Sequence, residues 1–218
     1  MDNQSTKEVK KKARGITLRL IIVAIVFLIT LSIFWIITDE IVLKKESSFD
    51  TLVFKKLNIL TTEGFTDIML FFTFCGSSTF LLPCYILLVL YHLLLRKNSA
   101  LSLNIIAIGL SSTGLLFLLK DIFKRERPID PMLQNVTGFS FPSGHSFSAF
   151  TFFGLVAYII WKTDIKHIWK WILSVLFILF AMGVALSRVY LHVHYASDVI
   201  AGFCLSMVWL IISLWLLD

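Results

Sequence analysis

Residues 187–217 read SRVYLHVHYASDVIAGFCLSMVWLIISLWLL, a polar island followed directly by an apolar run. The run Val199–Leu217 contains no charged residue. It is long enough to cross the hydrocarbon core of a bilayer, which takes about 20 mostly apolar residues. The island before it carries an arginine, two histidines and an aspartate. Because ionisable side chains at the edge of a membrane span cost free energy, we expect these residues to have a function.

The rest of the chain repeats this alternation of apolar runs and polar islands. Hydrophobic residues make up 57% of the 218 residues and charged residues only 16%, whereas a soluble domain carries roughly 25% charged residues. The pattern predicts an all-α, polytopic membrane protein of one domain with six transmembrane helices. The predicted spans are Ile16–Thr38, Ser78–Leu95, Ala100–Leu119, Ser146–Trp161, Ile168–Leu186 and Val199–Leu217.

The segment between the first two predicted spans is less apolar. Residues Lys44–Leu57 mix lysines with phenylalanine, leucine and valine, which predicts a short amphipathic helix on the membrane surface. The apolar stretch Ile68–Cys75 either lengthens the second span or forms a separate short helix.

Basic residues predict the orientation in the membrane. Residues 1–15 are rich in lysine and arginine and are interpreted as a cytoplasmic tail, followed by the membrane domain 16–218. Once Lys120, Arg127 and Arg188 are assigned to the polar islands, the remaining basic residues favour both termini in the cytoplasm. All islands then lie on the extracytoplasmic face of a plasma membrane. The net charge of +6 does not form a soluble basic face, so nucleic acid is not a predicted partner.

The third island, residues 187–198, has the composition of a phosphoryl-transfer site. His194 and Asp198 are four residues apart, which places them on one helix face if the last helix begins nearby. A carboxylate that accepts the Nδ1–H of an imidazole leaves Nε2 free as a nucleophile or base. The fork of Arg188 can bind two phosphate oxygens at once.

The first and second islands, residues 120–128 (KDIFKRERP) and 142–145 (PSGH), supply matching groups. Ser143 and the backbone N–H of Gly144 precede a predicted helix, whose amino end favours an anion. His145 adds a second imidazole, and Lys120 and Arg127 add fixed positive charges.

The sequence predicts that this chemistry uses no metal and no other cofactor. The islands lack the cluster of carboxylates that magnesium prefers. The cysteines Cys75, Cys84 and Cys204 lie in apolar segments, where neither zinc spacing nor a disulfide framework is recognisable.

The three islands together match a known pattern. The motifs K-x6-RP, PSGH and SR-x5-H-x3-D occur here as Lys120…Arg127-Pro128, residues 142–145, and Ser187-Arg188…His194…Asp198. In order and spacing they resemble the type 2 phosphatidic-acid phosphatase superfamily, which includes bacterial phosphatidylglycerophosphatase B and undecaprenyl-diphosphate phosphatases. The resemblance covers the chain from about Lys120 to its end.

The resemblance implies a role for each matching residue. His194 would attack phosphorus and be held by Asp198, while His145 would protonate the leaving oxygen and then activate water. The phosphate ligands would be Lys120, Arg127, Ser143, Gly144 and Arg188. The implied reaction is metal-independent hydrolysis of a lipid phosphate, such as phosphatidylglycerophosphate, phosphatidic acid or undecaprenyl diphosphate.

Alternatives remain open from the sequence alone. The same phosphohistidine serves a lipid phosphotransferase, and a lipid transporter would place charges near the bilayer midplane. His192 is a second candidate nucleophile, although only His194 lies four residues before Asp198. Residues 124–126 are interpreted as a solvated loop. The oligomeric state is not predicted.

Overall fold

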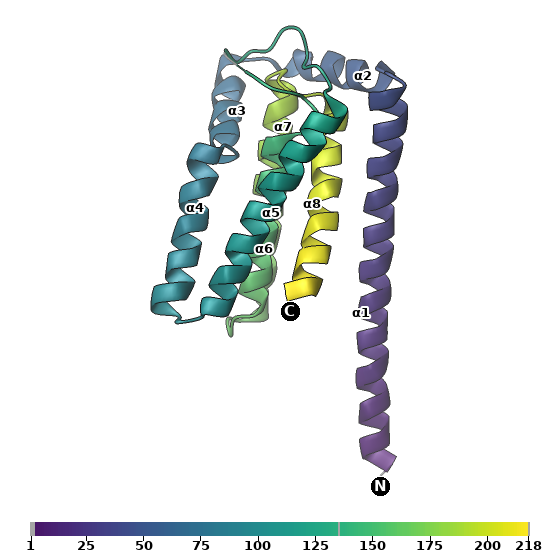
Figure 1. Ribbon diagram of the computed structural model, residues 1–218, viewed down its shortest axis with the longest axis vertical. Helices are drawn as coiled ribbons and strands as arrows, with labels where there is room; N and C mark the ends of the chain where they lie inside the picture. The colour runs from purple at the N-terminus through teal and green to yellow at the C-terminus, as the bar shows by residue number, and fades with distance from the viewer. Residues whose placement is uncertain (1–2, 135, 218) are drawn as a thin grey trace.

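The computed structural model describes residues 3–134 and 136–217, and that part of the chain is helical, without a strand. Figure 1 shows long, roughly parallel helices, with α2 lying across one end of the bundle and a long loop joining α5 to α6. The elements are α1 (Asn3–Ile36), the π-helical η1 (Ile37–Leu43), α2 (Ser48–Leu57), the 3-10 turn η2 (Asn58–Leu60), α3 (Glu63–Cys75), α4 (Ser78–Leu90), the π-helical η3 (Tyr91–Leu95), α5 (Ser99–Phe123), α6 (Gly144–Trp161), α7 (His167–Tyr190) and α8 (Ala196–Leu217).

Within the described residues, six helical segments are long and apolar enough to cross a membrane, which confirms the predicted polytopic fold. They are Leu20–Leu43, Ser78–Leu95, Ser99–Phe123, Gly144–Trp161, His167–Tyr190 and Ala196–Leu216. The helices run past several predicted ends, because residues of the polar islands occupy terminal helical turns: Lys120 lies in the last turn of α5 and Arg188 in that of α7.

Two helices, α2 and α3, connect the first span to the second. Residues 68–75 belong to α3, which Gly76 and Ser77 separate from α4, so the alternative of a separate short helix is correct. Thr62 caps α3 by accepting the N–H of Phe65. The segment predicted as amphipathic is helical only from Ser48 onward.

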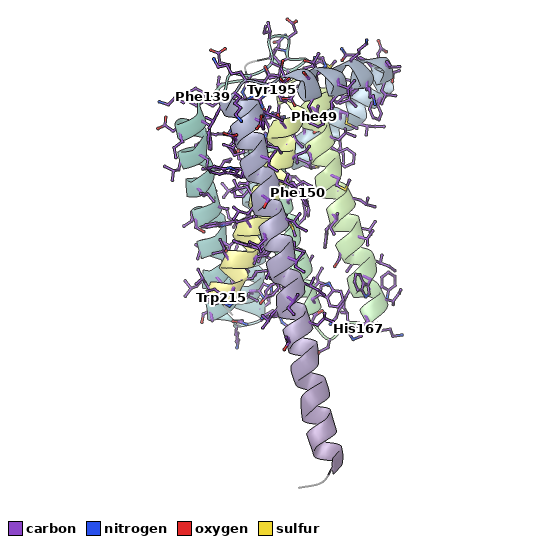
Figure 2. All side chains as sticks on the ribbon, turned by 90° about the vertical axis from the view of Figure 1, so that its right-hand side faces the viewer. Phe49, Phe139, Phe150, His167, Tyr195 and Trp215 are labelled. Carbon is purple, nitrogen blue, oxygen red and sulfur yellow. The ribbon has the colours of Figure 1, made fainter. Side chains whose placement is uncertain are left out.

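Helix α6 forms the centre of the bundle and packs against α4, α5, α7 and α8, while α1 packs against α8 and α3 against α7. Its buried residues include Ala149, Phe153 and Leu155. In Figure 1 the carboxyl ends of α5 and α7 meet the amino ends of α6 and α8 at the end of the bundle covered by α2. Figure 2 shows Tyr195 and Phe139 at this end, and His167 and Trp215 toward the other.

Candidate active site

The structure brings the predicted site residues together where four helix ends meet. Lys120 lies in the last turn of α5 and Arg188 in the last turn of α7. Residues 143–145 lie at the start of α6, and Asp198 lies in the first turn of α8. Arg127 comes from the long loop between α5 and α6, and His194 from the turn between α7 and α8.

His194 and Asp198 form a buried pair at the start of α8. The Nδ1 of His194 lies 3.5 Å from Oδ2 of Asp198, and both side chains are almost fully buried. Helix α8 begins at Ala196, so the pair spans the helix start and does not share a helix face. Asp198 is the third residue of α8, and its Oδ2 accepts the N–H of Tyr195 at 3.0 Å. This backward bond, typical of a helix N-terminus, fixes the carboxylate beside His194.

Ser140 bridges the two side chains and was not predicted from the sequence. Its hydroxyl donates to Oδ2 of Asp198 at 2.5 Å, and its Oγ lies 3.3 Å from Nδ1 of His194. Its backbone N–H donates to the carbonyl of Arg125 at 2.7 Å. Because Nδ1 faces a hydroxyl and a carboxylate, we assign the ring proton to Nδ1 and the lone pair to Nε2.

Arg127 lies against the free nitrogen of His194. Its Nη1 is 3.2 Å from Nε2 and also donates to the carbonyl of Val193 at 2.7 Å. The carbonyls of Gly138 and Thr137 accept from the remaining guanidinium nitrogens, at 2.8 and 3.0 Å. Burial lowers the pKa of His194 to about 4, although neighbouring Asp198 opposes the shift. The imidazole is therefore neutral near pH 7.

Arg188 and Lys120 add two further cations. The buried guanidinium of Arg188 donates through Nη1 to the hydroxyl of Thr73 in α3. Its Nε is buried without a hydrogen-bond partner in the part of the chain that the structure describes. This Nε therefore remains a donor available to an anion. Lys120 donates from Nζ to the carbonyl of Phe139 at 2.6 Å.

The start of α6 is held against α8. The N–H of Ser143 donates to the carbonyl of Asp198 at 3.0 Å, and its Oγ lies 3.0 Å from Oγ of Ser146. A Cβ added to Gly202 of α8 would lie 2.9 Å from the carbonyl oxygen of Ser143. Only glycine therefore lets α8 approach the Ser143 turn this closely. Gly144 and His145, at the first two positions of α6, are half-buried.

The prediction of a solvated loop at residues 124–126 is wrong for Arg125, whereas Lys124 and Glu126 are exposed as predicted. The side chain of Arg125 is only 13% exposed and forms ion pairs with Asp50 of α2 and with Asp198. Burial alone would lower the pKa of Arg125, but the two carboxylates outweigh it and raise the pKa. The missed signal is Asp50, an acid on the helix face of α2 that also carries the inward-facing Val53 and Phe54.

The structure separates the two neighbouring histidines. His192 has a left-handed backbone with φ of 53°, and its Nε2 lies 2.8 Å from Oδ1 of Asn58. Its ring packs on Phe54, with centroids 4.7 Å apart. His192 thus contacts the α2 segment, whereas His194 faces Asp198.

No group of three or more histidine, cysteine, aspartate or glutamate side chains is placed to hold a metal ion among the described residues. The three cysteines have free thiols.

The fold and site define a polytopic, all-helical membrane protein with a buried histidine–carboxylate pair among several cations. The family model of the PAP2 superfamily matches residues 98–218, and the chain belongs to this superfamily. The predicted resemblance is thereby confirmed, and the protein is a multi-pass membrane phosphatase.

Two curated proteins are similar in sequence. Phosphatidylglycerophosphatase B of Bacillus subtilis is 30% identical over 165 residues, which are 73% of this chain and 79% of that protein. Dolichyldiphosphatase of Saccharomyces cerevisiae is 37% identical over 94 residues, 39% of each chain.

Two crystal structures are similar in fold. The PAP2-type phosphatidylglycerolphosphate phosphatase from Bacillus subtilis has a TM-score of 0.79 at 26% identity, covering 87% of this chain and 94% of that chain. LpxE of Aquifex aeolicus has a TM-score of 0.56 at 24% identity, and the match covers 75% of this chain and 93% of that chain. The second likeness concerns the fold alone.

Proposed function

We propose that this protein hydrolyses a lipid phosphomonoester or diphosphate in two steps, through a phosphohistidine on His194 and without a metal. The observation that carries the proposal is the orientation of the His194 ring. Its Nδ1 lies toward Ser140 and Asp198, while its Nε2 faces the guanidinium of Arg127. A neutral imidazole with a fixed tautomer is a nucleophile, and a cation beside it attracts the phosphate.

In the first step, Nε2 of His194 attacks phosphorus and the bond from phosphorus to the lipid oxygen breaks. The leaving oxygen takes a proton from His145, and Asp198 stabilises the positive charge on His194. In the second step, His145 removes a proton from water, whose oxygen attacks phosphorus. The P–N bond breaks, phosphate leaves, and His194 returns to its neutral form.

The phosphoryl oxygens would be bound by Lys120, Arg127, Arg188, the hydroxyl of Ser143 and the N–H of Gly144. Phosphoryl transfer depends mainly on such charge neutralisation and positioning. The unpartnered Nε of Arg188 supports this role, because a buried donor without a partner costs free energy until a ligand accepts its hydrogen bond.

Phosphatidylglycerophosphate is the substrate we propose to test first. A phosphatidylglycerophosphatase of Bacillus subtilis resembles this chain over 79% of its own length. Phosphatidic acid and undecaprenyl diphosphate are the other proposed substrates, and the membrane bilayer supplies all three.

We further propose a plasma-membrane location with both termini in the cytoplasm and the site on the extracytoplasmic face. The excess of basic residues on the opposite side of the bundle supports it. A cysteine at exposed position 130 should react with an impermeant maleimide on intact cells, and one at exposed position 164 should not. The reverse labelling would contradict this orientation.

The decisive experiment measures phosphate release from the three lipids by purified protein in excess chelator, with His194→Ala as the blank. We expect release from the wild type alone and a labelled phosphohistidine after acid-free quenching. A requirement for magnesium would contradict the mechanism. Phosphate that appears only on an added acceptor lipid would indicate a phosphotransferase.

A further inference from the structure

We infer that Asp50 and Arg125 are positioning residues that hold Asp198, and through it His194, from the surface helix α2. The inference rests on the proposed function, because it assigns these residues to the same reaction. Asp50 and Arg125 lie outside the residues that the three motifs assign to the site.

The guanidinium of Arg125 joins carboxylates from two different helices. Its Nη1 donates to Oδ1 of Asp198 at 2.5 Å, and its Nη2 donates to Oδ2 of Asp50 at 2.8 Å. The ring of Tyr195 lies under the same group, 4.1 Å from the guanidinium carbon. A planar guanidinium with fixed donors orients its partners more strictly than a flexible ammonium.

Asp50 also binds the residue next to Asp198. Its Oδ1 accepts the N–H of Ser197 at 2.9 Å, and its Oδ2 accepts the Ser197 hydroxyl at 2.6 Å. The side chain is only 1% exposed. A buried carboxylate is costly unless it is paired and hydrogen-bonded, and here both requirements are met. Asp50 therefore connects α2 to the first turn of α8 in two ways, directly through Ser197 and through Arg125 to Asp198.

Helix α2 is seated so that this connection reaches the site. Val53, Phe54 and Leu57 pack against buried residues of α7 and α8, whereas Phe49 and Leu52 point outward. In Figure 1, α2 lies across the end of the bundle where α8 begins. The frame of the site thus includes a helix that lies more than 60 residues before the first motif in the sequence.

The two carboxylate oxygens of Asp198 bind different partners. Oδ1 binds Arg125, and Oδ2 receives Ser140 and the Tyr195 N–H beside His194. Without Arg125, Asp198 loses the cation that binds Oδ1 and keeps the hydrogen bonds of Ser140 and the Tyr195 N–H to Oδ2, so the carboxylate is held less strictly beside His194. A displacement of about 1 Å in an active site costs on the order of 100-fold in rate.

The test compares this buried pair with an exposed pair in the same segment. Asp121 and Lys124 lie 3.5 Å apart with side chains 77% and 60% exposed, so Asp121→Asn and Lys124→Gln are matched controls. We expect Asp50→Asn and Arg125→Gln to lower kcat by roughly 10–100-fold, with KM within about threefold of wild type. The controls should keep wild-type kcat. Arg125→Lys should recover several-fold of the loss.

A double variant tests whether Asp50 acts through Arg125. Asp50→Asn combined with Arg125→Gln should lower kcat by less than the product of the two single effects, since residues in one network are not additive. Thermal unfolding in detergent accompanies every assay, so that only folded protein is compared. If Arg125→Gln does not fold, Arg125→Lys and Asp50→Asn carry the same test.

The inference is overturned if the folded variants keep wild-type kcat, if KM rises while kcat is unchanged, or if the two substitutions multiply. Activity that persists in His194→Ala would instead overturn the proposed function. The two failures are therefore distinguishable.

Discussion

Nη1 of Arg127 lies 3.2 Å from Nε2 of His194, while Nδ1 of the same ring faces Asp198. The imidazole is thus enclosed between a cation and an anion, each on its own nitrogen. Such an arrangement fixes the tautomer without protonating the ring, because burial and the cation both oppose a second proton.

This arrangement sets the pH dependence. The pKa of His194 is lowered from 6.5 to about 4, so the imidazole proposed as the nucleophile stays neutral well into the acid range. As pH falls through about 4, protonation removes the lone pair and kcat/KM decreases. The profile of kcat/KM reports groups of the free enzyme and is measured with a short-chain lipid phosphate in detergent. An acid limb centred near pH 6.5 would contradict the assignment.

Ser140 should matter more than an ordinary buried serine. Ser140→Ala removes the hydroxyl that bridges His194 and Asp198, and we expect kcat to fall by about 10-fold with little change in KM. Ser206→Ala is the control, because Ser206 is also buried but its hydroxyl donates to the carbonyl of Phe203 within its own helix. Equal effects of both substitutions would count against the bridging role.

The neighbouring histidines should behave differently. His194→Gln is expected to lower kcat by at least about 1,000-fold, as loss of a nucleophile usually does. His192→Gln should stay within about threefold of wild type, because His192 bonds Asn58 and packs on Phe54. Steady-state phosphate release from both variants decides between them. A large loss in the His192 variant at wild-type stability would reopen the choice of nucleophile.

Gly202 tests the contact between α6 and α8. Gly202→Ala places a Cβ 2.9 Å from the Ser143 carbonyl, and overpacking of this kind costs about 1–3 kcal/mol. We expect a lower unfolding temperature and reduced kcat. Gly114→Ala in α5 is the control, since a Cβ there meets nothing within 4 Å. If the two variants unfold at the same temperature, the close approach is not constraining.

The membrane spans were predicted well from the sequence because crossing a bilayer requires one simple property, a continuous apolar stretch of sufficient length. Their ends were less accurate where a polar side chain such as Lys120 or Arg188 still belongs to the last helical turn. The start of the last helix was also placed too late, since Asp198 stabilises the turn that begins at Ala196.

The motif residues were predicted to lie together, and the structure places them together. The residues that hydrogen-bond to them were not predicted. Ser140 bonds Asp198, Asp50 bonds Arg125 and Thr73 bonds Arg188. Each supporting residue is distant in sequence from its partner and belongs to a common residue type. Arg125 was misinterpreted because its partners are contributed by α2 and α8, and pairing across helices has no local signature. The spacing of Asp50 relative to Val53 and Phe54, which places the acid on the apolar face of a helix, is the clue that the sequence does contain.

The chemical groups occupy helix ends, whereas the bodies of the same helices present apolar side chains such as Leu110 and Leu179 outward. Substitutions on the outward surface can therefore change what a lipid chain meets while leaving the end that carries the proposed site intact. The proposed reaction and the preference for a lipid chain would then depend on different parts of the molecule.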